Sequence, residues 1–222
     1  MKKDAELIQI FGRRGSGKST LAKGLLKGRP KVIVFDPRNE YAEQRGWTVA
    51  YTRTDVLKAM KRNWARGFHI AYVPEAGQEI EALHKLTLIC WQAQSPYEDG
   101  RDPRKLTLVI EEADLSYPVT RLPADRSGMQ RIVNQGRHVG IECIAVSQRP
   151  AQISATYRAN VATSYLFALA ADVDRQEMLR LIGRSHADRL RSLPPYRALV
   201  HENGQVRAIE VRQNGQIRPI SI

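Results

Sequence analysis

The chain has 222 residues, of which 42% are hydrophobic and 26% are charged. This composition excludes a disordered chain, and the length predicts one globular domain. The formal net charge of +12 favours a polyanionic partner, nucleic acid first and an acidic membrane surface second, although the charge could serve solubility alone. Because no apolar run reaches the ~18 residues of a membrane span, we expect no integral membrane segment. We also expect no signal peptide and two buried, reduced thiols, Cys90 and Cys143.

Short apolar runs alternate with helix-like stretches through residues 1–193, a pattern typical of a mostly parallel sheet flanked by helices. The predicted strands are 7–11, 32–35, 47–51, 69–73, 106–110, 141–147 and 164–170. The predicted helices are 19–27, 55–66, 78–94, 127–138 and 172–182. Asp172 or Asp174 is expected to cap the last helix, and 95–105 is expected to be a loop.

The pattern changes after Pro194-Pro195. Three short strands, 196–201, 206–212 and 216–220, are separated by two Asn-Gly pairs, which strongly favour tight hairpins. We therefore expect residues 194–222 to form a small antiparallel β meander appended to the core. It would either flank the main sheet or contact a neighbouring molecule.

A phosphate-binding motif, G-x-x-x-x-G-K-[ST], follows the first predicted strand and opens the first predicted helix. Its residues are Gly12, Arg13, Arg14, Gly15, Ser16, Gly17, Lys18, Ser19 and Thr20. Glycines allow backbone N–H groups to surround phosphates, and the positive end of the helix points at the same anion. We expect Lys18 to reach the β- and γ-phosphates of ATP, Ser19 to bind Mg²⁺, and Thr20 to lie at the α-phosphate. Arg13 and Arg14 would either meet phosphate or add to a basic surface.

Two adjacent acids, Glu111 and Glu112, end the apolar strand 106–110. A phosphate loop needs a carboxylate at the end of a neighbouring buried strand to hold Mg²⁺, and Glu111 is the better candidate for that role. Glu112 could orient and deprotonate the attacking water, a function that separates hydrolases from P-loop kinases. Asp114 is expected to be a cap or loop residue.

Two further polar residues are candidates for contact with the γ-phosphate. Gln148 follows the strand 141–147 and could bind the phosphate or its water. Arg137, near the end of a predicted surface helix, could stabilise the transition state in a neighbouring subunit. Other candidates for this arginine finger are Arg131, Arg149 and Arg158.

Several motifs together resemble those of the HerA/FtsK-type DNA-pumping ATPases. They are the phosphate loop, FDPRNEY after the second strand, LVIEEAD, GRHVGI and SQRP, and they cover about residues 6–183. The length is most similar to that of the genome-packaging ATPases of tectivirus-type and related archaeal membrane-containing viruses. The resemblance implies a RecA-like α/β core in a ring, usually a hexamer, with ATP between subunits and duplex DNA in the pore.

The resemblance also assigns roles residue by residue. Lys18 and Ser19 belong to the Walker A element, Glu111 and Glu112 to Walker B, Gln148 to the sensor, and Arg137 is the candidate trans finger. The first Walker B acid is commonly Asp, so Glu111 is a departure. Partners would be double-stranded DNA, further copies of the chain, and capsid or membrane-vertex proteins, in the host cytoplasm or at the packaging vertex.

Basic loop residues are the candidates for DNA contact, because a pore needs phosphate contacts and no base readout. They are Arg101, Arg104, Lys105, Arg121 and Arg126. The alternative functions are a zonula-occludens-toxin-like phage assembly or secretion ATPase, and a non-hydrolysing ATP-gated binding protein. A small-molecule kinase is disfavoured by Glu112 and Gln148.

Overall fold

The structure of the protein, a computed structural model, describes residues 5–221, and their strands form one sheet in the order β10-β9-β8-β7-β1-β6-β5-β2-β4-β3. The strands are β1 (Leu7–Phe11), β2 (Lys31–Phe35), β3 (Thr48–Ala50), β4 (Phe68–Tyr72), β5 (Leu106–Ile110), β6 (Ile141–Ser147), β7 (Thr163–Leu166), β8 (Arg197–Glu202), β9 (Gln205–Val211) and β10 (Ile217–Ile220). The α-helices are α1 (Lys18–Leu25), α2 (Arg53–Asn63), α3 (Glu79–Ala93), α4 (Ser95–Glu98), α5 (Ala113–Ser116), α6 (Gly128–Gln135), α7 (Ala155–Ala159), α8 (Asp172–Ile182) and α9 (Ala187–Ser192).

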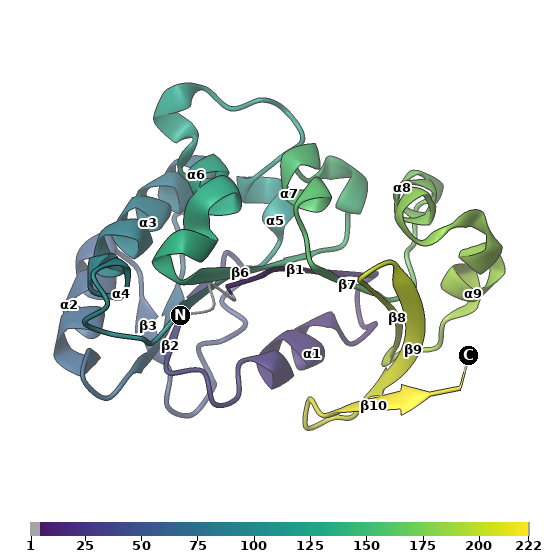
Figure 1. The fold of residues 1–222 in the computed structure, drawn as a ribbon, viewed down its shortest axis with the longest axis horizontal. Coiled ribbons are helices and arrows are strands. Elements are labelled where there is room, and N and C mark those ends of the chain that lie inside the picture. Colours follow the sequence, from purple (N-terminus) through teal and green to yellow (C-terminus); the bar gives the residue numbers. More distant parts are fainter. Residues whose placement is uncertain (1–4, 222) are drawn as a thin grey trace.

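The strands from β3 to β7 in this order run parallel, and helices cover both faces of that part of the sheet. Strands β2 and β5 are buried along their whole length, as expected for parallel strands with two covered faces. Helix α1 lies on one face, and α3, α6 and α7 lie on the other (Figure 1). Each face carries its own apolar core. The predicted α/β fold is therefore confirmed.

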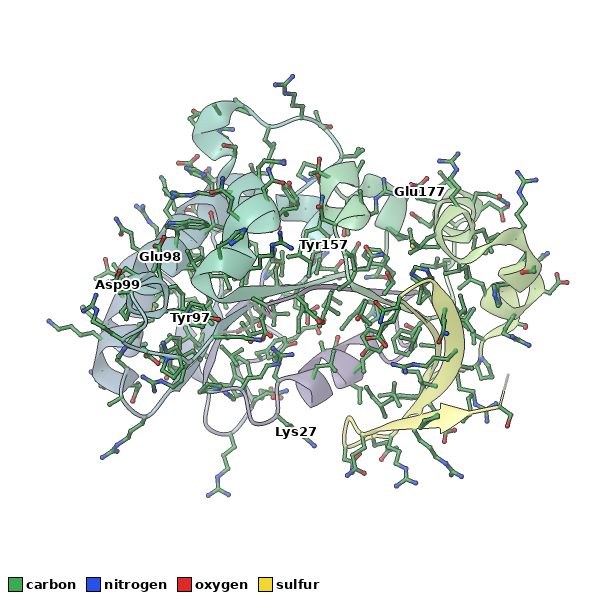
Figure 2. The ribbon with its side chains drawn as sticks, in the orientation of Figure 1. Lys27, Tyr97, Glu98, Asp99, Tyr157 and Glu177 are labelled. Carbon is green, nitrogen blue, oxygen red and sulfur yellow. The ribbon has the colours of Figure 1, made fainter. Side chains whose placement is uncertain are left out.

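The C-terminal strands extend the main sheet. β8 pairs antiparallel with β7, and β9 and β10 follow as antiparallel neighbours. Asn203 and Gly204 adopt positive φ angles of 51° and 74°, as a two-residue hairpin requires. The β9–β10 turn packs on α1, and Lys27, two residues after that helix, donates from its ammonium to the Asn214 carbonyl; Figure 2 shows Lys27 near that hairpin. The antiparallel meander thus flanks the sheet, whereas the division of the chain at residue 194 stays a prediction.

Several predicted element boundaries are wrong, among them the end of the expected helix 55–66, which lies at Asn63. The expected loop 95–105 begins with the short helix α4, because Pro96 occupies a first-turn position where its missing N–H costs nothing. The expected helix 127–138 ends as α6 at Gln135 and continues as a 3₁₀ turn, Gly136–Val139. The expected strand 164–170 ends at Leu166, where the chain leaves the sheet to cover the phosphate loop.

The predicted acidic cap of α8 is also wrong. Ala171 precedes the helix, and no side chain caps the N–H groups of its first turn. Asp174 is buried and instead accepts hydrogen bonds from Arg149 Nε at 2.9 Å and from the Ala151 N–H at 3.0 Å. It therefore anchors the segment that follows β6.

The interior on the face of the sheet covered by α3, α6 and α7 contains a buried phenol and two thiols. The Tyr157 hydroxyl donates to the Ile8 carbonyl at 2.7 Å and accepts from the Ala145 N–H at 3.1 Å, which ties α7 to β1 and β6 (Figure 2). Cys90 and Cys143 are free and buried as predicted, and burial raises the pKa of each thiol to about 12. Within residues 5–221, no helix is long and apolar enough to cross a membrane.

Candidate nucleotide-binding site

The phosphate-loop sequence forms a tight turn between β1 and α1. Gly17 has a φ of 110°, a conformation that residues with a side chain rarely adopt. At Gly12, a Cβ would lie 2.5 Å from the Cβ of Phe167, so a side chain there would displace its neighbour. The glycines that the motif requires are therefore also the residues that this backbone requires.

The interior of the loop fits an anion. The Ser16 hydroxyl is buried and, among the described residues, makes no hydrogen bond. The first turn of α1 contains no acidic residue and no capping side chain, so no side chain neutralises the positive end of the helix at its N–H groups. Lys18 Nζ donates to the Arg13 carbonyl at 3.2 Å; burial lowers the pKa of Lys18, and the nearby Glu112 and Glu111 oppose that effect. Phosphate oxygens would provide hydrogen-bond acceptors for the Ser16 hydroxyl and the N–H groups of α1, and a negative charge beside Lys18.

A cavity of about 350 Å³ lies beside the loop, at the carboxyl ends of β2, β5 and β6. Its lining combines the cationic end of the loop with carboxylates and amides. The lining residues are Arg14, Gly15, Lys18, Ser19, Arg38, Glu40, Glu111, Glu112, Val146, Ser147 and Gln148. Thr20 faces a second cavity of about 280 Å³, between α1 and the β9–β10 turn, and Arg13 is exposed.

Glu111 ends β5 inside the protein, with only 5% of its surface exposed. The Tyr41 hydroxyl donates to its Oε1 at 2.7 Å. Burial raises the pKa of the Glu111 carboxyl to about 7, and the negative charges of Glu40 and Asp36 act in the same direction. The hydrogen bond from Tyr41 and the charge of Lys18 act in the opposite direction. A cation bound beside this carboxyl would lower its pKa and favour its ionised form.

Glu112 lies where the chain leaves β5, in the left-handed conformation with φ 46°. This strained turn lets two adjacent acids face the same cavity rather than opposite faces of a strand. Gln148 Nε2 donates to Glu112 Oε1 at 3.0 Å, so the side chains that follow β5 and β6 meet. Asp114 lies in α5 and accepts a hydrogen bond from the Ser147 hydroxyl at 2.5 Å.

The segment after β2 supplies two site residues, Glu40 and Tyr41, whose roles sequence reasoning did not identify. The buried Asp36 carboxylate accepts the N–H groups of Glu40 at 3.0 Å and Tyr41 at 2.9 Å, which fixes the turn. Glu40 Oε2 then accepts the Ser19 hydroxyl at 3.1 Å, and Tyr41 reaches Glu111. The FDPRNEY sequence was a recognisable signal, but a contact across 70 positions cannot be read from it.

The residues present fit a Mg²⁺ ion held mainly by nucleotide oxygens. Among residues 5–221, no group of three His, Cys, Asp or Glu side chains could hold a metal alone. Mg²⁺ typically binds one or two protein groups together with phosphates and water. Ser19 and Glu111 line one cavity and offer a hydroxyl and a carboxylate of this kind.

Arg137 lies far from this cavity. It is exposed beside the starts of β1 and β6, whereas the phosphate loop follows the end of β1. It therefore cannot serve its own loop, and only a neighbouring copy could receive it. Two of its competitors are engaged within the chain: Arg149 pairs with Asp174, and Arg158 with Glu177. Arg131, the third, lies over the Trp91 ring at 3.7 Å.

Most of the basic loop residues proposed for DNA contact pair with acids of the same chain. The pairs are Arg101 with Asp99, Arg104 with Asp102, Lys105 with Glu142, and Arg126 with Glu81. Arg104 also donates to the Ala65 carbonyl at 2.9 Å, which makes it a structural residue. Arg121 is exposed in the segment between α5 and α6.

Comparisons with known proteins agree with the fold. Residues 8–97 match the family model of the helicase HerA central domain, whereas no curated protein sequence matches the chain. A genome packaging NTPase, B204 of Sulfolobus turreted icosahedral virus 2, solved with ATP-gammaS, shares the fold. Its TM-score is 0.72 at 17% identity, over 94% of this chain and 98% of that one.

Two further solved structures have a similar fold. VirB4 of Thermoanaerobacter pseudethanolicus has a TM-score of 0.66 at 14% identity, over 92% of this chain and 89% of its own. EssC (ATPases 2 and 3) of Geobacillus thermodenitrificans has a TM-score of 0.58 at 16% identity, over 93% of this chain and 39% of its own. The resemblance indicated by the motifs is thereby confirmed: the chain is similar to the HerA/FtsK-type P-loop ATPases, in sequence over residues 8–97 and in fold over more than nine tenths of its length.

Proposed function

We propose that the protein is a Mg²⁺-dependent ATPase that assembles into a hexameric ring and drives double-stranded viral DNA into a capsid. The observation that carries the proposal is the cavity in which the phosphate loop, Glu111 and the Glu112–Gln148 pair converge. Each of these groups has a defined task in hydrolysis of a triphosphate.

The phosphate loop binds and orients the substrate. Its N–H groups and Lys18 surround the phosphates, with the terminal phosphate directed at the carboxylates. Ser19 and Glu111 would hold Mg²⁺, which when bound would supply positive charge to the phosphates. In this structure the Ser19 hydroxyl donates its proton to Glu40, which leaves the lone pairs of its oxygen available for a metal ion.

Glu112 is the proposed general base. Its carboxylate accepts a proton from the attacking water, and Gln148, which donates to the same carboxylate, orients both. Arg137 of a neighbouring copy would add positive charge at the terminal phosphate. It cannot act within its own chain, because it lies beside the starts of β1 and β6 and the phosphate loop lies at their other end.

The DNA-packaging part of the proposal has separate support. The net charge of +12 favours a polyanion, and B204, which shares the fold, is a genome packaging NTPase. Arg121 is the proposed DNA contact, since it is exposed and the other four candidates are in ion pairs. The partners would include capsid or membrane-vertex proteins, in the host cytoplasm or at the packaging vertex.

Neither alternative is favoured by a specific observation. A non-hydrolysing ATP-gated binding protein has no need for a carboxylate–amide pair facing the terminal phosphate. The zonula-occludens-toxin-like function gains no support from a fold likeness of TM-score 0.42 to that toxin's N-terminal domain from Neisseria meningitidis.

Steady-state phosphate release and nucleotide binding, measured on two variants, test the proposal. Glu112→Gln should abolish turnover and still bind ATP, because the amide keeps the shape and removes the base. Lys18→Ala should lose both. DNA should stimulate the wild-type activity, less so as salt is raised. Turnover that survives in Glu112→Gln would refute its role, and no turnover in the wild type under any condition would refute the ATPase.

A further inference from the structure

Tyr196 is a strained aromatic residue between α9 and β8. Its φ of 63° is left-handed, a conformation that costs free energy for any residue with a bulky side chain. Strain of this kind persists where the surrounding structure enforces it, and it is concentrated at ligand-binding sites. Its side chain is nevertheless not part of the core, because 39% of the residue is exposed.

Backbone hydrogen bonds connect Tyr196 to the phosphate loop and to β9. Its N–H donates to the Ser16 carbonyl at 2.8 Å, and its carbonyl accepts the Val211 N–H at 2.7 Å. The preceding residues, Pro194 and Pro195, restrict the approach of the chain. The C-terminal meander is thus connected directly to the loop that is proposed to bind phosphate.

The ring of Tyr196 lies against Gly17. A Cβ placed on Gly17 would be 3.0 Å from Tyr196 Cδ1 and 3.3 Å from the ring of Phe167. Phe167 is fully buried, so Tyr196 is the residue of this pair that presents aromatic surface to solvent beside the loop. Neither the fold nor the proposed hydrolysis requires that exposed ring.

The strand order places this ring on the side of the loop opposite the carboxylates. The loop follows β1; β6 and β5, with Gln148, Glu111 and Glu112, lie to one side, and β7 and β8 lie to the other. If the terminal phosphate points at the carboxylates, the nucleoside leaves the loop toward β7 and β8. That direction leads to Tyr196.

We propose that the exposed Tyr196 ring is the surface on which the nucleobase of the bound nucleotide stacks. The inference rests on the proposed nucleotide binding and adds to it the residue that selects the base. The loop contacts only phosphates, which all nucleoside triphosphates share. Stacking on an aromatic ring favours the larger surface of a purine over that of a pyrimidine, so selectivity for purine nucleotides follows from Tyr196.

Calorimetric titration with ATP, CTP and inorganic tripolyphosphate tests the proposal, because tripolyphosphate has the phosphates and no base. Tyr196→Asn and Tyr196→Gly remove the ring and tolerate the left-handed backbone; Tyr196→Phe keeps the ring. We expect the first two to bind ATP roughly 5- to 150-fold more weakly, the range that single base–aromatic stacks cover. Tripolyphosphate affinity should stay within about twofold, because the phosphate contacts do not involve the ring. Tyr196→Phe should bind all three ligands as the wild type does.

The outcomes separate this inference from the function on which it rests. Equal weakening of ATP and tripolyphosphate would show that Tyr196 supports the loop rather than the base, and unchanged ATP affinity would overturn the proposal directly. A preference for ATP over CTP that survives removal of the ring would also overturn it. Wild-type protein that binds neither ATP nor tripolyphosphate would refute the nucleotide site itself.

Discussion

Replacing Glu111 with glutamine should stabilise the nucleotide-free protein, and the gain should increase with pH. Burial raises the pKa of this carboxyl to about 7, from an ordinary value of 4.5. The folded protein therefore holds the proton more tightly than the unfolded chain does. Ionisation of Glu111 costs folding free energy, and glutamine, which keeps an oxygen to accept the Tyr41 hydroxyl, does not ionise.

The two pKa values set the magnitude and the pH range. Below about pH 4.5 the carboxyl is protonated in both states, so it does not lower the stability. As the pH rises, the unfolded chain ionises first, and the loss is complete once the pH passes the folded pKa of about 7. At about 1.4 kcal/mol per pH unit, the full loss is about 3 kcal/mol, of which about 2 kcal/mol falls between pH 5 and pH 8.

Urea unfolding at pH 5 and pH 8, without nucleotide and with a chelator, measures this difference. The free energy of unfolding of Glu111→Gln minus that of the wild type should rise by about 2 kcal/mol between the two conditions. Glu112→Gln is the matched control, because it makes the same change from acid to amide at the adjacent, half-buried position, so the effect of burying Glu111 appears as the difference between the two variants. If the curves of stability against pH for wild type and Glu111→Gln run parallel, burial does not govern this carboxyl.

Two further predictions concern the finger and the core. Lys18→Ala and Arg137→Ala should each be inactive. Mixing the two proteins should restore ATPase activity at about a quarter of the interfaces, where an intact loop meets an intact arginine. A mixture as inactive as its components would contradict a trans finger. Asp102→Asn should cost about 3 kcal/mol in urea unfolding, because the fully buried Lys31 ammonium loses the carboxylate at 2.8 Å. Asp99→Asn, in an exposed ion pair, should cost less than about 0.5 kcal/mol, and equal losses would refute the reasoning.

The sheet could be predicted from sequence because its strands carry their own signals. β1, β5 and β6 were predicted to the residue, since each is a mainly apolar run bounded by glycine, charged or amide residues. The hairpins at Asn203-Gly204 and Asn214-Gly215 follow from local turn chemistry. Short helices such as α5, α7 and α9 have four to six residues, which is too few for a helical period to be recognised.

The contacts within the site could not be predicted in the same way. The phosphate loop is a local motif, so its position was evident. The bond from Tyr41 to Glu111 joins residues 70 positions apart, and the contact of Tyr196 with the loop depends on β8 pairing with β7. Asp174 shows the opposite error: a helix-start acid suggested a cap, and burial made it a partner for Arg149.

The strand directions explain why these distant segments meet. Parallel strands bring all their carboxyl ends to one edge of the sheet, and an antiparallel strand next to them begins at that edge. Six connections therefore converge there. They contain Gly12 after β1, Asp36 after β2, Glu111 at the end of β5, Gln148 after β6, Phe167 after β7, and Tyr196 before β8. A parallel β8 would begin at the opposite edge and could not place Tyr196 beside the loop. The switch to antiparallel pairing is thus what connects the C-terminal meander to the candidate nucleotide site.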